Sequence, residues 1–552
     1  MHALKMPWFR LVGLVLSLTL ALHFLLKAQQ SPNPFFSSFI LLNHTLPPRS
    51  DENEQGLLPE VWKQKDDRGR QCLSRFQYQS YRRHPSSPSR PSDSLIQRLR
   101  EYEELHARCA GEADKSPPSP SDPPCQFIVA VGYMGLGNKM ISLVATFIYA
   151  LLTNRVLLIA AAENMDRLFC EPFPQSSWLL PKSKMDLLYS LNDSFRFGSV
   201  VKAFGSGECN TSGVKYPETV LVRITHEYDR DDTKFFCEEQ QGVIRSQVPW
   251  VFVRSNVFYV PSLYYVPSFK SEMERLFPGE DAIFHHATRY LLHPSNSVWK
   301  RTTRFYDSYL AHAETLVGIQ MRAPPGFEGV RKNYAREVLQ CAVENRVLPN
   351  VTQEEPEILG ETSEINHKNI TLEDQSQALT SKKSSNSSSS SGRSIAVLVT
   401  SLNQAHLEAL RATYLNAATE GGIRVSVHQP SHEEHQKTGQ THHDEKALME
   451  IFLLSLADTL ITSPLSTFGY AAQGLAHLRP WLMWIQPNPE HPVCTRVFAS
   501  DPCFLNFEPY SCDCNRTREE TTLENLIRQC EEDVPNRRWV KIDSRKERNA
   551  SD

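Results

Sequence analysis

Residues 126 to 159, QFIVAVGYMGLGNKMISLVATFIYALLTNRVLLI, decide the fold, because a short apolar strand runs into a glycine turn, a helix and a second apolar strand. We expect Gly135 and Gly137 to take positive φ and to let backbone N–H groups approach a ligand. The following helix would direct the positive end of its dipole at a bound anion. Asn138 is placed to cap this helix. One face of the helix is apolar, with Ile141, Val144, Ala145, Ile148 and Leu152.

The turn lacks the dinucleotide-binding fingerprint. Gly132, Gly135 and Gly137 do not have the G-x-G-x-x-G spacing, and no acidic residue closes a following second strand in the usual way. Short glycine motifs also occur in ordinary strand-to-helix turns. From the turn alone, a phosphate cradle and an ordinary turn are both open.

The composition is that of a globular protein with two or three domains. The chain has 552 residues, of which 40% are hydrophobic and 22% are charged. A formal net charge of −4 gives no general attraction to nucleic acid or to an anionic membrane. We therefore expect no nucleic-acid partner.

The amino terminus predicts a membrane anchor over residues 11–27. Lys5 and Arg10 precede its apolar run, and Lys27 closes it. A cleaved signal peptide is the alternative, but no convincing small-x-small cleavage site follows the run. The basic flank favours a single-pass type II anchor, with residues 1–10 as a cytoplasmic tail and the rest of the chain in the lumen.

Two further features indicate the secretory pathway. Asn-x-Ser/Thr acceptor sequences follow the apolar run at Asn43, Asn192, Asn210, Asn350, Asn369, Asn386, Asn515 and Asn549. The chain has twelve cysteines, and those between Cys494 and Cys530 form a cluster that an oxidising lumen would cross-link. The Cys512-x-Cys514 pair could instead bind a metal, but it lacks a second spaced pair. We favour disulfides, whose pairing the sequence leaves open.

Composition divides the rest of the chain into a stem and two α/β domains. Residues 28–124 are rich in Pro and Ser, which predicts a stem with one helix near 94–108. We expect the first α/β domain over 125–315 and the second over 316–545. A polar, Ser-rich insertion at 345–394 interrupts the second domain and is expected to be disordered.

Strands and helices alternate in the second domain. Strands are expected at 318–322, 395–401, 423–429, 459–463 and 481–486, and helices at 403–418, 444–457 and 466–476. This order predicts a parallel sheet covered on both faces. In the first domain, the aromatic segment 248–266 is expected to be a buried strand or a pocket wall. Two such regions place a ligand site in the cleft between them, at the carboxyl ends of strands.

Polar residues at two strand ends are candidates for that cleft. Arg322 ends the strand GIQMR, from which a guanidinium could bind a diphosphate through two hydrogen bonds. A surface ion pair is the alternative role. Ser463, Ser466 and Thr467 lie at a strand-to-helix junction, where hydroxyls and free N–H groups can bind an anion or simply cap the helix.

Two weak metal signals do not change this interpretation. Asp229-Arg-Asp231 has the Asp-x-Asp form of a divalent-cation site but lies in a charged run. Histidines between His428 and His443 are dense, but their spacing is not that of a zinc motif. We predict no metal site and no cofactor.

Several motifs occur in one order: GLGNKMISLVATFIYALLTNRVLLI, VPWVFVRSNVFYVPSL, RYLLHPSNSVW, GIQMR, LVTSLN, HQPSHEEHQKT and LADTLITSPLSTFGYAAQGLAHLRPW. Together they resemble the plant xyloglucan fucosyltransferase family, over roughly residues 125 to 530. The resemblance implies a GT-B-like fold of two Rossmann-type domains facing a cleft. It also implies a Golgi enzyme that moves L-fucose from GDP-fucose to a cell-wall glycan, with inversion and without a metal.

The resemblance also implies roles for particular residues. Arg322 would neutralise the donor diphosphate as the sugar bond breaks. Further donor-site residues would be Gly137, Asn138, Lys139, His428, Gln429, Ser463, Ser466, Thr467 and Phe468.

Two departures from the family pattern concern the same cleft. Lys139 stands where Arg is frequent, and Asn256 stands where the xyloglucan-acting members have Asp on the acceptor side. Since Asn cannot accept a proton, the general base stays unassigned, with Glu433 and Glu434 as candidates by residue type. We expect a fucosyltransferase whose acceptor is a terminal galactose or arabinose of a wall polysaccharide or proteoglycan. The alternative is a secretory-pathway pseudoenzyme that binds a glycan without turnover.

Overall fold

The structure is a computed structural model. It describes residues 57–58, 72–83, 90–115, 124–160, 164–203, 215–225, 231–279, 282–322, 333–352, 393–484, 492–505, 527–531 and 538–541. The predicted anchor at 11–27 lies outside the described residues, as do Asp229 and residues 353–392 of the predicted insertion.

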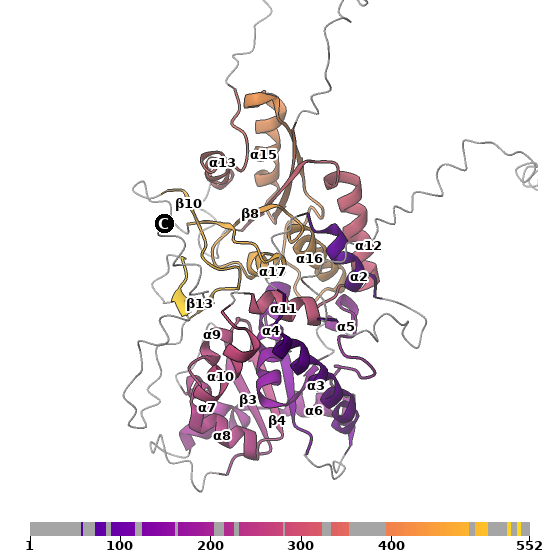
Figure 1. Ribbon diagram of the computed structural model, residues 1–552, viewed down its shortest axis with the longest axis vertical. Helices are drawn as coiled ribbons and strands as arrows, with labels where there is room; N and C mark the ends of the chain where they lie inside the picture. Colours follow the sequence, from indigo (N-terminus) through magenta and orange to yellow (C-terminus); the bar gives the residue numbers. More distant parts are fainter. Residues whose placement is uncertain are drawn as a thin grey trace, which may run out of the picture. The chain divides into compact units, whose positions relative to one another are not determined.

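A four-stranded parallel sheet has the order β2-β1-β4-β3. Figure 1 labels its strands β3 and β4. Its strands are β1 Phe127–Gly132, β2 Val156–Ile159, β3 Thr219–Ile224 and β4 Trp250–Ser255. Helix α4, Leu136–Thr153, connects β1 to β2, so the strand, turn, helix and strand predicted for 126–159 are confirmed. The aromatic segment 248–266 is buried, as predicted, in β4 and the short helix α9, Val260–Leu263.

A six-stranded sheet has the order β10-β9-β8-β5-β6-β7, and only β10 is antiparallel to its neighbour. Its strands are β5 Thr315–Met321, β6 Ser394–Ser401, β7 Arg424–His428, β8 Thr459–Thr462, β9 Trp481–Met483 and β10 Cys494–Arg496. Four helices lie between these strands in sequence: α13 Tyr334–Glu344, α15 Gln404–Asn416, α16 Thr441–Leu454 and α17 Thr467–Ala476. The predicted alternation of strands and helices is therefore confirmed.

The remaining elements surround these sheets. The helices are α2 Leu73–Tyr81, α3 Asp93–Cys109, α5 Met165–Leu168, α6 Lys182–Ser190, α7 Phe197–Ala203, α8 Glu238–Gln247, α10 Pro267–Leu276, α11 Ile283–Leu291 and α12 Asn296–Phe305. A small antiparallel sheet near the carboxyl end contains β11 Phe504–Leu505, β12 Ile527–Gln529 and β13 Arg538–Lys541.

One hydrophobic core joins the two large sheets. It contains Ile128 and Val253 from the first sheet and Leu316 and Leu398 from the second. Helices α4, α11, α16 and α17 lie between the sheets and supply most of the packing (Figure 1). Because strand residues alternate between faces, Val317 and Val399 instead pack on α13 and α15. The protein is therefore an α/β fold in which two parallel sheets share a helical layer.

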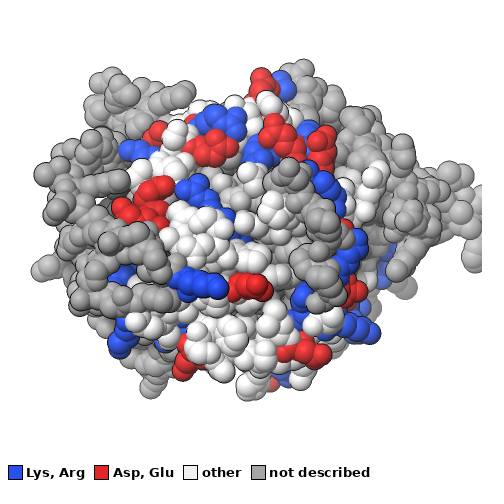
Figure 2. Space-filling model, turned by 90° about the horizontal axis from the view of Figure 1, so that it is seen from below, with Lys and Arg blue, Asp and Glu red and all other residues white. Residues whose placement is uncertain are grey.

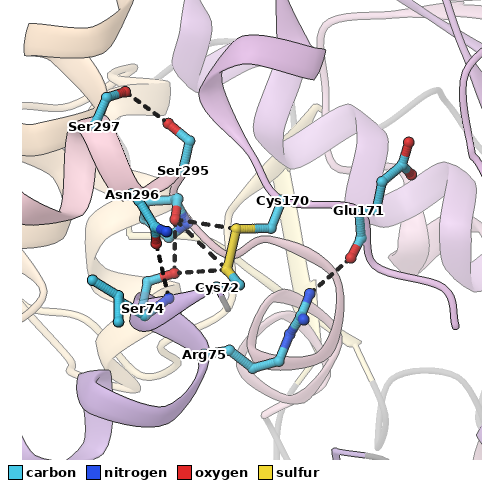
Figure 3. The surroundings of a disulfide bond; sticks show 10 residues. Cys72, Ser74, Arg75, Cys170, Glu171, Ser295, Asn296 and Ser297 are labelled. Atoms are coloured by element: carbon cyan, nitrogen blue, oxygen red, sulfur yellow. Dashed lines mark hydrogen bonds between the residues drawn. A yellow bond between two sulfur atoms is a disulfide. The ribbon is translucent and has the colours of Figure 1, made fainter. Parts of the chain in front are cut away.

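The structure corrects part of the predicted stem. Helix α2 lies inside the range 28–124, but it is packed on the folded body: Tyr78 is fully buried and donates to Ser455 Oγ at 3.0 Å. A disulfide joins Cys72 to Cys170 (Figure 3). The sequence missed α2 because its buried side chains include the polar Ser74 and Arg75, so the apolar period of a helix is weak.

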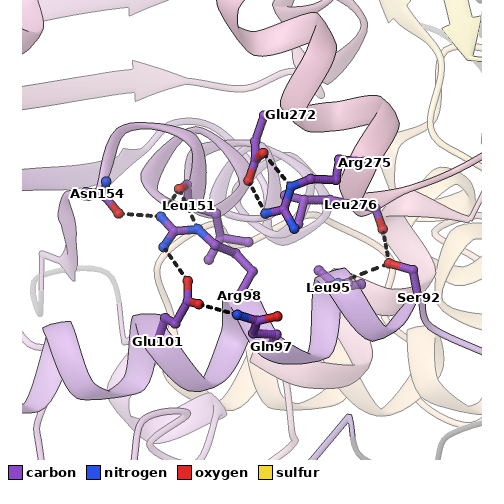
Figure 4. Close-up of polar contacts among 10 residues, drawn as sticks. All are labelled: Ser92, Leu95, Gln97, Arg98, Glu101, Leu151, Asn154, Glu272, Arg275 and Leu276. Atoms are coloured by element: carbon purple, nitrogen blue, oxygen red, sulfur yellow. Dashed lines mark hydrogen bonds and ion pairs between the residues drawn. The ribbon is translucent and has the colours of Figure 1, made fainter.

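Helix α3 is also part of the body. The Ser92 hydroxyl caps it by accepting from the Leu95 N–H at 3.0 Å, and donates to the Leu276 carbonyl at 2.6 Å (Figure 4). Arg98 donates to the Leu151 carbonyl and to Asn154 at the end of α4. The predicted helix near 94–108 is confirmed. It packs on the folded body and hydrogen-bonds to the ends of α4 and α10, and it is not part of an extended stem. For the rest of 28–124 the stem stays a prediction.

Disulfides hold several loops in the described part of the chain. Besides Cys72–Cys170, the pairs are Cys109–Cys125, Cys341–Cys494 and Cys503–Cys530. Cys503–Cys530 closes the carboxy-terminal region as expected, whereas Cys494 ties β10 to α13. The Cys512-x-Cys514 pair lies outside the described residues.

The hydropathy of α4 and the charge of the surface are both those of a folded globular body. Within the described chain, α4 is the one helix long and apolar enough to cross a membrane, and 89% of it is buried, as expected of a core helix. On the face drawn in Figure 2, basic and acidic side chains are interspersed over the described surface. This mixed charge accords with the small net charge of the whole sequence.

Candidate active site

A cavity of about 550 Å³ opens at the carboxyl ends of β1, β5, β6 and β7. One wall comes from the first sheet, through the turn Gly135–Asn138. Most of the rest comes from the second sheet, through Arg322, the segment after β6 and the amino terminus of α17. The cavity has the position that the sequence predicted for a ligand cleft.

The glycine turn differs from its prediction in backbone conformation. Gly135 has φ −72° and Gly137 is the second residue of α4, so neither takes positive φ. Met134 takes it instead, at φ 69°. Gly137 is required for a different reason, since a Cβ on it would lie 2.7 Å from the backbone carbon of Thr467. The glycine therefore permits α4 and α17 to meet at the cavity floor.

Asn138 does not cap α4, because the cap position is Gly135 and the Asn138 side chain points toward the cavity wall. Its amide nitrogen donates to the Asn256 carbonyl at 2.9 Å, while its oxygen accepts from the Thr467 hydroxyl at 3.0 Å. Asn138 thus hydrogen-bonds to the end of β4 and to α17 at once, and it fixes the two walls of the cavity relative to each other.

Arg322 follows β5 and lines the cavity. Its backbone N–H donates to Ser463 Oγ at 2.8 Å, which fixes the strand end. Its guanidinium has no ion pair or hydrogen bond to any residue that the structure describes, and burial lowers its pKa from the ordinary arginine value. Because a guanidinium stays protonated in proteins, this half-buried cation favours an anionic ligand.

The β8–α17 junction faces Arg322, as the sequence predicted. Ser466 is the cap residue of α17, yet its side chain makes no capping hydrogen bond. In the described part of the structure the buried Ser466 hydroxyl has no hydrogen-bond partner. Thr467 and Phe468 line the cavity, and the first N–H groups of α17 are available there. Arg322 and this helix start together form an anion site.

Sequence reasoning missed most of the far end of the cavity, although Glu433 and Glu434, named as candidate bases, line it. Its additional lining residues include Thr400 and Ser401 at the end of β6, Leu402, Asn403 and His406 after it, and His443, Asp444, Ala447 and Glu450 on α16. The strand-end rule could have found the first group, because LVTSLN, residues 398–403, spans the carboxyl end of β6. The sequence did not indicate the α16 residues, because the side of this helix that faces the cavity mixes polar and apolar side chains and has no distinct pattern.

Four carboxyl groups lie on this far wall in different environments. Glu433 accepts from Lys446 at 2.6 Å, a contact that lowers the pKa of its carboxyl. Glu450 accepts from Ser431 at 2.6 Å, and burial raises its pKa to about 7. Burial also raises the pKa of Asp444. Glu434 is exposed and makes no ion pair or hydrogen bond with the described residues.

Six predicted site residues do not line the cavity: Ser463 and Ser466, described above, and Lys139, Asn256, His428 and Gln429. Lys139 is buried on α4 close to Asp444, and Asn256 is buried with its amide directed at the Met134 sulfur, 3.0 Å away. His428 contacts Ser426 Oγ at 2.9 Å, and Gln429 donates to the Ser401 carbonyl at 2.8 Å. These residues adjoin lining residues, and their roles stay predictions.

The weak metal signals have structural explanations where they are described. Asp231 of the Asp-x-Asp pattern lies 3.7 Å from the Lys234 ammonium. The adjacent Asp232 accepts from Arg196 at 2.6 Å and from the Gly198 N–H at 2.9 Å. His443 lies 3.6 Å from Glu433. Among the described residues, no group of three or more His, Cys, Asp or Glu side chains could hold a metal ion.

A strand-end arginine that faces a helix amino terminus in a parallel α/β protein is suited to a phosphorylated ligand. The sequence model of the family described as xyloglucan fucosyltransferase matches residues 47–515. The chain therefore belongs to the xyloglucan fucosyltransferase family, and the resemblance drawn from its motifs is confirmed. It is accordingly an enzyme of the glycosyltransferase class.

Individual relatives agree with this assignment. A galactoside 2-alpha-L-fucosyltransferase of Arabidopsis thaliana is 37% identical over 476 residues, which cover 84% of this chain and 79% of the relative. Probable fucosyltransferase 8 of the same plant is 36% identical over 483 residues, covering 84% and 87%. The solved structure of a mutant of Arabidopsis thaliana FUT1 in complex with GDP has a TM-score of 0.71 at 35% identity, covering 88% of this chain and 99% of that one.

Proposed function

We propose that this protein transfers L-fucose from GDP-fucose, with inversion and without a metal, to a terminal galactose of a cell-wall polysaccharide or proteoglycan. The observation that carries the proposal is the Arg322 guanidinium in the cavity, which faces the start of α17 and has no side-chain partner in the described part of the chain. The relative of known structure that covers most of this chain was solved with GDP. A GDP-sugar supplies the diphosphate that this cation and helix end favour.

In the proposed reaction, an acceptor hydroxyl oxygen bonds to C1 of fucose as the bond from C1 to the β-phosphate oxygen breaks. GDP leaves with increased negative charge, which Arg322 neutralises through two parallel N–H donors. The amino terminus of α17 adds a second stabilising dipole. Arg322 thereby does the work that a divalent cation performs in metal-dependent transferases.

The proton of the acceptor hydroxyl needs a base. Asn256 cannot take it, since an amide has no basic site at neutral pH. Glu433 is paired with Lys446, and Glu450 accepts a hydrogen bond from the Ser431 hydroxyl. Glu434 is the lining carboxylate that has no partner among the described residues, so we assign it as the candidate base.

We further propose a GT-B-like arrangement, in which the first sheet binds the acceptor and the second binds the donor. Gly135–Asn138 and Arg322, contributed by opposite sheets to one cavity, support it. The proposed location is the Golgi membrane, with a single amino-terminal span and a lumenal catalytic region. The apolar run at 11–27 and its basic flank support the anchor, and the disulfides support an oxidising lumen.

The test is an acceptor panel with the full chain in detergent. GDP-fucose is supplied with galactosylated and arabinosylated glycans, with and without EDTA, and the product linkage is read by NMR. The proposal expects transfer to a galactoside, an α-linked product and no effect of EDTA. Transfer that EDTA abolishes would contradict the metal-free mechanism.

A glycan-binding protein without turnover is the competing function, favoured by Asn256 in place of Asp. Calorimetry separates the two. Binding of GDP supports the enzyme, whereas glycan binding without GDP binding supports the competitor.

A further inference from the structure

One buried hydroxyl, that of Ser463, joins three segments of the chain beside Arg322. Strands β5 and β8 are paired as far as Gln320 and Thr462. Beyond that pair, Ser463 Oγ accepts from the Arg322 backbone N–H at 2.8 Å and lies 2.5 Å from the Tyr334 hydroxyl. It also donates to the Gln320 carbonyl at 3.1 Å. The end of β5, the end of β8 and the first residue of α13 therefore meet at one oxygen atom.

The direction of each hydrogen bond follows from the chemistry of a hydroxyl group. A serine hydroxyl has one proton to donate and two lone pairs that accept. Because the Gln320 carbonyl can only accept, the Ser463 proton is directed at it. The Tyr334 O–H must then donate to Ser463, as the Arg322 N–H does. These three bonds use the full capacity of the Ser463 oxygen, and the loss of any partner would leave a buried polar group unsatisfied.

The Tyr334 ring makes a second contact, at the wall formed after β6. Tyr334 is fully buried, and its ring lies edge-to-face against His406 with the ring centres 5.7 Å apart. His406 lines the cavity, and its Nδ1 is 2.9 Å from the Ser401 hydroxyl. Buried side chains are close-packed in one rotamer, so Tyr334 is a rigid link between this wall and the backbone of Arg322.

The position of the Arg322 backbone decides what its guanidinium can reach. A bidentate contact with a phosphate needs two N–H groups in the correct plane and at the correct distance. An error of about 1 Å in such a contact costs on the order of 100-fold in rate. Arg322 and Tyr334 also flank residues 323–332, which the structure does not describe. Ser463 Oγ thus holds the two described ends of that stretch at one point.

We propose that Tyr334 is a positioning residue for the donor: its hydroxyl, acting through Ser463, holds the Arg322 backbone where the guanidinium can bind the β-phosphate. This inference rests on the proposed use of GDP-fucose. Tyr334 does not line the cavity, so it acts through Arg322 and not by contact with the donor. Since GMP lacks the β-phosphate, loss of the Tyr334 hydroxyl should weaken the binding of GDP more than that of GMP.

The test is calorimetric titration of GDP and GMP into the full chain in detergent. Tyr334→Phe removes the hydroxyl and keeps the ring against His406. The GDP Kd should rise by about three- to tenfold, as expected for one lost hydrogen bond, and the GMP Kd should change much less. The ratio of the two affinities should therefore fall, which a general loosening of the fold would not produce.

A second variant and a control identify the route. Ser463→Ala removes the shared oxygen and should weaken GDP binding at least as much. The double variant should bind GDP no more weakly than Ser463→Ala alone, because Tyr334 acts through that oxygen. Tyr414→Phe is the matched control: it removes a hydroxyl that donates to the Pro349 carbonyl at 3.0 Å, on helix α15 and outside the cavity lining. It should change neither affinity.

The outcomes separate this inference from the function on which it rests. An unmodified ratio of GDP to GMP affinity in Tyr334→Phe would overturn the positioning role and leave the proposed function intact. Equal weakening of both ligands would also overturn it, because it would mark a structural role. Fully additive effects in the double variant would refute the route through Ser463. If the unmodified chain failed to bind GDP, both proposals would be wrong.

Discussion

Gly137→Ala is expected to damage donor binding by separating the two walls of the cavity. A Cβ at this position would lie 2.7 Å from the Thr467 carbonyl carbon and 2.8 Å from the Phe468 nitrogen. Both are backbone atoms of the α17 start, so no side chain can rotate away. Ordinary contact begins at 3.4 Å, and the helices must therefore separate by about 0.7 Å.

Two opposing effects set the size of the change. Alanine favours a helix over glycine by about 1 kcal/mol, and overpacking costs about 1–3 kcal/mol. The net free energy of unfolding should therefore fall by no more than about 2 kcal/mol. Catalysis is more sensitive, because a displacement near 1 Å in a site costs about 100-fold in rate. We expect kcat/KM for GDP-fucose to fall at least about tenfold while the protein stays folded.

The assay is initial-rate fucosyl transfer with thermal melting on the same preparations. Gly135→Ala is the matched control on the same turn, since its Cβ would meet only the movable end of Gln436. Gly111→Ala, where nothing lies within 4 Å, controls for the substitution itself. If Gly137→Ala kept the activity of Gly135→Ala, the close approach of α4 and α17 would not be what shapes the donor site.

Three further predictions concern the same core and cavity. Asn138→Ala removes the hydrogen bond to Thr467 that joins the cavity walls, together with the bond that holds Asn138 to the end of β4. The GDP Kd should therefore rise about tenfold by calorimetry, and an unchanged Kd would contradict the role of this bridge. Burial depresses the pKa of His285 and of His293 below 6.5; the unfolded chain then binds more protons, and stability is lost as pH falls below 6.5. Tm should therefore drop between pH 7.5 and 5.5, and a constant Tm would refute this. Glu450, whose pKa is raised to about 7, makes stability depend on pH in the opposite direction. Its contribution to the free energy of unfolding is complete below pH 4.5 and is lost as pH rises through 7. Glu450→Gln should therefore raise the free energy of unfolding at pH 8 by up to about 3 kcal/mol, and Tm should rise with it. At pH 5.5 the increase should be much smaller, and an equal shift of Tm at both pH values would argue against a buried charge.

The alternation of strands and helices was predictable because it depends on local periodicity. The elements from β1 to β2 and from β5 to β9 follow apolar runs whose lengths and turns are visible in the sequence. Arg322 and Thr467 could be placed in one cavity because the carboxyl ends of parallel strands share an edge. Local pattern and topology were sufficient for these features.

Other features depend on contacts between distant segments. The requirement for Gly137 comes from α17, more than three hundred residues away, and not from its own φ. Asn138 was expected to cap a helix because capping is local, whereas its partners are Asn256 and Thr467. Helix α2 carries few apolar residues and is held by Cys170, so a composition-based stem was the wrong inference there. Tertiary partners of this kind leave no periodic trace in a single sequence.

Calorimetric titration of GDP and GMP tests whether Arg322 holds the donor diphosphate. The unmodified chain should bind GDP more tightly than GMP. Arg322→Ala should weaken GDP binding by about 10- to 100-fold, as expected for a lost charged bidentate contact, and should bring the two affinities together. Arg496→Ala, which removes an exposed arginine stacked on Trp481 away from the cavity, is the control and should change neither. An Arg322→Ala protein that melts normally and still distinguishes GDP from GMP would contradict the assignment of this cavity as the diphosphate site.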